Sequence, residues 1–76
     1  MPTKSMRVGI MWVAIIAVCA AQVGIANCDQ RTAIVWAPLP ERCAGVIECQ
    51  QYGQTVAAAA GLVKAGEILK VFCRPE

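Results

Sequence analysis

One long apolar run near the N-terminus constrains this chain more than any other feature. Residues 8–26 contain Gln22 as their only clearly polar side chain, and the basic residues Lys4 and Arg7 precede them. A basic start, an apolar stretch and small residues at its end are typical of a secretory signal peptide. The run also reaches the length of about 17–25 residues with which a helix spans a bilayer. We therefore predict an N-terminal hydrophobic helix that serves as an export signal or as an uncleaved anchor.

Small residues define two candidate cleavage sites at the end of this run. Cleavage after Ala21 follows the small-x-small pattern, and so does cleavage after Ala26. We favour the first, because it leaves an apolar segment of ordinary length, and take residues 1–21 as the signal peptide and 27–76 as the exported domain. Positive charge before an apolar segment keeps the N-terminus inside. Residues 27–76 are therefore expected outside the cytosol, either secreted (periplasmic in a bacterium) or on a single-pass membrane protein.

Charge narrows the choice of partner. The formal net charge is +2, and residues 27–76 carry as many acidic as basic side chains, so the excess lies in the leader. Nucleic-acid binding needs a basic patch that neutralises phosphates. We therefore expect an extracellular or envelope protein as the partner and no nucleic acid, with membrane contact only through an uncleaved N-terminal segment.

The cysteines predict a covalent framework for the exported part. Cys19 lies inside the apolar run, and four cysteines follow it: Cys28, Cys43, Cys49 and Cys73. An even number of cysteines in a short exported chain indicates disulfides, and a domain of this size needs such staples to be stable. The chain has no histidine and no Cys-x2-Cys pair, so we expect no metal site and no redox motif.

Local sequence patterns predict a small α+β or β-rich domain. Three segments contain many β-branched or aromatic residues, which favours three short strands: residues 31–37, which end at Pro38, and residues 46–52 and 67–73, each bounded by glycine or proline. The alanine-rich residues 55–65 favour a short helix, with Thr55 as its N-cap. A hairpin in place of this helix, within residues 55–72, remains open.

This outline suggests a pairing of the cysteines. If the first two strands are antiparallel and the third is antiparallel to the second, Cys43 approaches Cys73. Cys28 would then pair with Cys49. The predicted disulfides are therefore Cys28–Cys49 and Cys43–Cys73.

Catalysis is not expected. Without histidine the chain lacks the commonest general base and any Ser–His or Cys–His pair. The glycines of residues 61–66 lack the spacing of a phosphate-binding loop. We therefore predict no catalytic residues, no cofactor and no enzymatic activity.

The best candidate for partner binding is the segment around two prolines. Pro38 and Pro40 stiffen the backbone into an extended segment, and it is flanked by Trp36 and Arg42, residue types that dominate interfaces. Trp36, Leu39 and Arg42 are thus the candidate partner-binding residues. A simpler interpretation, which we prefer, is that the prolines end a strand and Trp36 packs in a small core.

These features together predict a small secreted cysteine-containing protein that binds an extracellular macromolecule, as defence, toxin-like, reproductive and host-interaction proteins do. A first alternative is a protease inhibitor that presents the loop from Pro38 to Arg42, with Leu39 or Arg42 entering the specificity pocket. A second alternative is a small single-pass membrane protein that modulates a larger complex.

Overall fold

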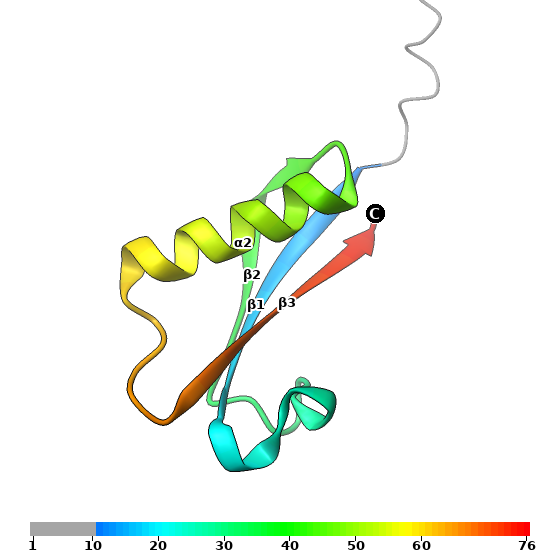
Figure 1. Cartoon of the computed structure of the whole chain (residues 1–76). Coiled ribbons are helices and arrows are strands. Elements are labelled where there is room, and N and C mark those ends of the chain that lie inside the picture. Colours follow the sequence, from blue (N-terminus) through cyan, green and yellow to red (C-terminus); the bar gives the residue numbers. More distant parts are fainter. Residues whose placement is uncertain (1–10) are drawn as a thin grey trace, which may run out of the picture.

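The apolar run supplies the central strand of a three-stranded antiparallel sheet in the computed structural model, which describes residues 11–76 (Figure 1). Residues 14–19 of this strand are at most 3 % exposed. The strand order is β2-β1-β3, with bounds β1 (Trp12–Ala20), β2 (Val35–Cys43) and β3 (Glu67–Pro75). A strand that is covered on both faces has a continuous apolar sequence, which is also the property of a leader. These residues therefore form a strand here and not the predicted hydrophobic helix.

The structure describes only the second part of the predicted leader. Lys4, Arg7 and the start of the apolar run lie outside the described residues. Within residues 11–76, no helix combines the length and hydropathy that a membrane crossing requires. Cleavage after Ala21 or Ala26 stays a prediction, and either cut would remove β1. The sheet described here therefore belongs to the uncleaved chain.

An α-helix, α2 (Val46–Ala60), connects β2 to β3 and packs on one face of the sheet (Figure 1). The predicted strand over residues 46–52 is therefore wrong, because these residues form the first half of the helix. The helix buries Cys49, Gly53 and Ala57, which are spaced four apart and are all small. A Cβ atom added to Gly53 would lie 2.5 Å from a methyl carbon of Val71. The small residues thus allow the helix to approach β3 closely.

The helix ends at Ala60, five residues before the predicted end at residue 65, and Gly61 caps it. Gly61 has a φ of 64°, in the left-handed region that favours glycine. Its N–H bonds to Ala58 O at 3.2 Å, and the N–H of Leu62 bonds to Ala57 O at 3.1 Å. This pair of hydrogen bonds is the Schellman motif, and Leu62 packs against the same cluster as Ala57. The alanine-rich segment is thus helical, and the alternative hairpin is not formed.

Strand β2 continues through both prolines, where the sequence predicted a stop at Pro38. Pro38 lies opposite Ile15 and Arg42 opposite Val13, so residues 39–41 together face Ala14. An edge strand tolerates proline at such a bulge, because its outward-facing backbone does not bond to another strand. The predicted first strand is thus shifted towards the C-terminus, whereas the third predicted strand is confirmed as β3.

Two disulfides hold the fold, and neither is a predicted pair. Cys19 bonds to Cys28, with a Cα–Cα distance of 5.8 Å, and Cys49 bonds to Cys73, with a distance of 6.1 Å. Cys43 is a buried free thiol. The predicted pairing fails because it assumed a strand at Cys49, which the helix replaces, and because it left Cys19 out with the leader.

Candidate binding surface

The face of the sheet opposite α2 contains the best candidate for a functional surface. Side chains alternate along a strand, and those of Val35, Ala37 and Leu39 pack in the cluster beneath α2. Their neighbours point to the other face, where Trp36 and Phe72 pack over a separate cluster around Ala17. We call this surface the open face and define it by Trp36, Pro38, Arg42, Lys70 and Phe72.

Two aromatic side chains bridge the open face across the central strand. The ring centroids of Trp36 and Phe72 are 5.2 Å apart, and the rings are tilted by 53°. Ala17 lies directly opposite Trp36 on β1 and is fully buried. Its short side chain leaves space above β1 in which rings from the two outer strands meet. Such a tilted pair contributes about 0.5–1.5 kcal/mol beyond the area that it buries.

Lys70 adds a positive charge beside the aromatic pair. Its Nζ lies 4.9 Å from the Phe72 ring centroid, which is the geometry of a cation–π contact. The same Nζ donates a hydrogen bond of 3.1 Å to Ile25 O. Lys70 therefore connects the open face to the segment between β1 and β2.

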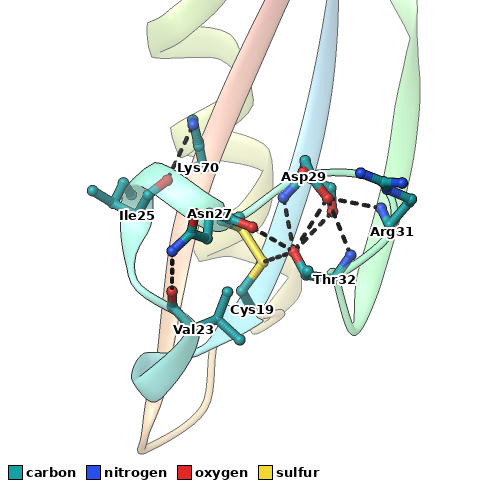
Figure 2. The surroundings of a disulfide bond; sticks show 9 residues. Cys19, Val23, Ile25, Asn27, Asp29, Arg31, Thr32 and Lys70 are labelled. Carbon is teal, nitrogen blue, oxygen red and sulfur yellow. Dashed lines mark hydrogen bonds between the residues drawn. A yellow bond between two sulfur atoms is a disulfide. The ribbon is translucent and has the colours of Figure 1, made fainter.

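That segment covers one end of the open face and contains two short 3-10 helices, η1 (Ala21–Val23) and η2 (Ile25–Asn27). It lies at the end of the sheet away from the C-terminus (Figure 1). The disulfide between Cys19 and Cys28 attaches it to the last part of β1, and both sulfur-bearing residues are buried (Figure 2). The segment is thus held in place by a covalent bond.

Hydrogen bonds around Asp29 order the turn that follows the disulfide (Figure 2). The Asp29 carboxylate accepts from the backbone N–H of Arg31 at 2.9 Å and of Thr32 at 3.2 Å. The Thr32 hydroxyl donates to Asn27 O at 2.7 Å. The hydrogen bond from the Arg31 N–H is the main reason that the pKa of Asp29 lies below its usual range.

Exposed apolar side chains extend the open face at this end. Ile34 is 59 % exposed and lies just before β2, two residues from Trp36. Ile25, whose carbonyl binds Lys70, is 54 % exposed. These two isoleucines thus lie at the border of the open face.

The structure separates the three candidate residues that the sequence singled out. Trp36 lies on the open face, and so does Arg42, which is opposite Val13. Leu39 instead packs between the sheet and α2, in contact with both buried clusters there. Leu39 is therefore not presented on an exposed loop, as the protease-inhibitor alternative requires.

Arg42 is engaged by the last residue of the chain. Its Nη2 donates to Glu76 Oε2 at 3.0 Å and its Nε donates to Glu76 Oε1, while Nη1 donates to Pro40 O at 2.9 Å. The hydrogen bonds from Arg42 lower the pKa of Glu76, and those to Glu76 raise the pKa of Arg42. The charge of Arg42 is thus largely compensated within the molecule.

Sequence reasoning missed Lys70 and Phe72. Ile68, Lys70 and Phe72 alternate along the third predicted strand and would therefore share a face. Nothing in the sequence places that face beside Trp36. In the described sheet, β2 and β3 each pair only with β1, whose residues were expected to belong to the leader.

Other sites on the described residues are weaker candidates for a functional site. A shallow hollow of about 300 Å³ lies beside the second half of α2, and its lining is apolar apart from one amide: Gln54, Ala57, Ala58, Gly61, Val63 and Leu69. Among residues 11–76, no group of three or more potential metal ligands comes together. The open face therefore remains the main candidate.

No protein-family model matches the chain, and neither a curated protein nor a solved structure matches it.

Proposed function

We propose that this chain is a small binding protein that acts outside the cytosol and docks another protein through the open face. The observation that carries the proposal is the Trp36–Phe72 pair, with Lys70 over the Phe72 ring and the exposed Ile34 two residues before Trp36. Aromatic residues are enriched at the centres of protein interfaces, where they bury large areas at a low cost in conformational entropy.

The charge of the surface supports a protein partner. Arg42 is paired with Glu76, and Lys70 is directed to a carbonyl and a ring. Arg74, which also lies opposite Val13, adds one exposed cation, so the described part of this face has no array of free cations for phosphates. An apolar centre with a few polar groups at its border instead fits a protein surface of similar character.

The disulfides support action in an oxidising compartment. Cys19–Cys28 and Cys49–Cys73 would persist after export and would be reduced in most cytosols. Binding through the open face requires the uncleaved chain, because β1 lies beneath the aromatic pair. If the leader is removed or spans a membrane, the open face does not form and this proposal fails.

Site-specific photocrosslinking tests the proposal. A benzophenone side chain in place of Ile34, at the border of the open face, is compared with the same side chain in place of Ile47. Ile47 is 74 % exposed and lies in α2, so it is a matched apolar control. The purified, oxidised protein is irradiated with the extracellular or envelope proteins of its source.

We expect position 34 to give a discrete crosslinked protein and position 47 to give none. An excess of the unmodified chain should suppress the crosslink from position 34. Crosslinks of equal yield from both positions, or no competed crosslink from position 34, would contradict docking through the open face.

A further inference from the structure

Three of the five cysteines belong to one cluster between the sheet and α2. Cys43 is 7 % exposed and Cys49 is fully buried in this cluster, and Cys73 packs against the cluster and is bonded to Cys49. Cys43 is the one cysteine of the chain that forms no disulfide. A thiol thus lies beside a disulfide in a shared apolar environment.

Topology determines which sulfur Cys43 can attack. Cys43 lies opposite Trp12 on one side of β1, and Cys73 lies opposite Ala14 on the other side. Two strand spacings, about 9–10 Å, separate their backbones. Cysteines with Cα atoms more than about 7 Å apart are not bridged without backbone movement. Cys49, which reaches over β1 from the helix, is therefore the sulfur available to Cys43.

We propose that Cys43, Cys49 and Cys73 form an internal thiol–disulfide exchange site. Cys43 loses its proton to solvent, and its thiolate attacks Cys49 Sγ. The Cys43–Cys49 bond forms as the Cys49–Cys73 bond breaks, and Cys73 leaves as a thiolate that takes up a proton. One disulfide and one thiol are present before and after, so the step needs neither an oxidant nor a reductant.

The exchange moves the free thiol towards the surface. Cys43 is buried, whereas Cys73 is only half-buried and its Sγ lies 3.8 Å from Val46 O, a contact at the surface of the molecule. The new bond would connect the end of β2 to α2 and release the end of β3. A protected thiol is thereby exchanged for one that can react with external reagents.

Peptide mapping of the whole oxidised chain distinguishes the two forms, because trypsin cleaves after Arg42, Lys64 and Lys70. In the original pairing, peptide 43–64 is linked to peptide 71–76. After exchange, peptide 43–64 contains an internal disulfide and peptide 71–76 is released with a free Cys73. The protein is incubated with iodoacetamide at about pH 8.5, near the ordinary pKa of a thiol, and is then acidified and digested.

We expect alkylated peptide 71–76 to accumulate, and to accumulate more slowly at lower pH, because only the thiolate attacks. Peptide 8–31, which contains Cys19 and Cys28, should keep its internal bond and serves as an internal control.

Cys43→Ser and Cys43→Ala both remove the attacking thiol and should abolish the release of peptide 71–76. Both variants are made, one polar and close in shape to cysteine and one apolar and smaller, so that one folded control is obtained, as checked by circular dichroism. Failure of the unsubstituted protein to release alkylated peptide 71–76, or equal release from a folded Cys43 variant, would overturn the proposal. Neither result bears on partner docking at the open face.

Discussion

Trp36 and Phe72, on the two outer strands, meet across β1 with their ring centroids 5.2 Å apart. Trp36 lies opposite Ala17 and Phe72 lies opposite Ile15, so the contact is diagonal, and the short side chain of Ala17 leaves space for it. The contact therefore couples the two edges of the sheet as well as forming the centre of the open face.

This coupling predicts a double-mutant effect. Phe72→Leu keeps most of the buried apolar area and removes the ring, so we expect a loss of about 0.5–1.5 kcal/mol in the free energy of unfolding. In a Trp36→Leu background the same substitution should cost less, because the ring contact is already absent. Urea unfolding monitored by far-ultraviolet circular dichroism measures all four proteins. An equal cost in both backgrounds would show that the rings are not coupled.

The position of β1 predicts what truncation does. A chain that begins at Gln22 or Asn27 lacks the strand to which both β2 and β3 bond, and it leaves Cys28 without Cys19. We expect such oxidised chains to show no cooperative thermal unfolding, whereas the full chain unfolds cooperatively. Cooperative unfolding of residues 27–76 alone would contradict the sheet and would favour the leader interpretation of residues 8–26.

The close approach of α2 to β3 predicts that Gly53→Ala has opposite effects on stability in the native protein and in a variant with a smaller residue at position 71. Gly53→Ala places a methyl group against Val71. Overpacking costs about 1–3 kcal/mol, which exceeds the gain of about 1 kcal/mol in helix propensity. We therefore expect net destabilisation in the native background. In a Val71→Ala background both methyl contacts are absent and only a 3.3 Å contact with the Cβ of residue 71 remains. The gain in helix propensity should then outweigh the crowding, so Gly53→Ala should stabilise. Chemical denaturation measures both effects, and destabilisation of similar size in both backgrounds would argue against the contact.

The turn at Asp29 predicts a dependence on pH. The hydrogen bond from the Arg31 N–H, followed by those from Thr32, lowers the pKa of this carboxyl in the folded state. A group whose pKa is lower when folded stabilises above its unfolded pKa, and this stability is lost as the pH falls through the folded value. We expect stability to decrease below about pH 4, the ordinary range of an aspartate.

Asp29→Asn should reduce this acid dependence, and thermal unfolding of both proteins between about pH 2 and pH 6 measures it. Glu76, whose pKa Arg42 lowers, contributes in the same direction, so Glu76→Gln is the matched comparison. If the thermal stability of the Asp29→Asn protein depends on pH as steeply as that of the native protein, protonation of Asp29 is not coupled to unfolding.

Some elements follow from the sequence because their local signals are sufficient. Strand β3 is predicted by its β-branched residues between Gly66 and Pro75, and the alanines of α2 predict a helix. The first half of α2 was mistaken for a strand because Val46 and Ile47 have high strand propensity. The four-residue spacing of Cys49, Gly53 and Ala57 is the signal for a helix that packs closely. Because these residues are small, the buried face of the helix differs little in hydrophobicity from the opposite face.

The central strand could not be recognised from hydropathy. A buried strand and an export leader both consist of continuous apolar residues, and Trp12–Ala20 satisfies both descriptions. This ambiguity extends to the candidate site. Trp36 was identified by residue type, whereas its partner Phe72 depends on a strand order that only β1 creates.

The two ends of the described chain are adjacent, because the backbone N–H of Glu76 donates to Met11 O at 2.8 Å. Strands β1 and β3 are antiparallel, so a pulling force between these ends would separate their hydrogen bonds one after another, as in a zipper. Such loading is mechanically weak, but the opening would soon reach Cys73, whose bond to Cys49 attaches β3 to the helix. The disulfide is thus placed where it limits how far the molecule can be opened by tension.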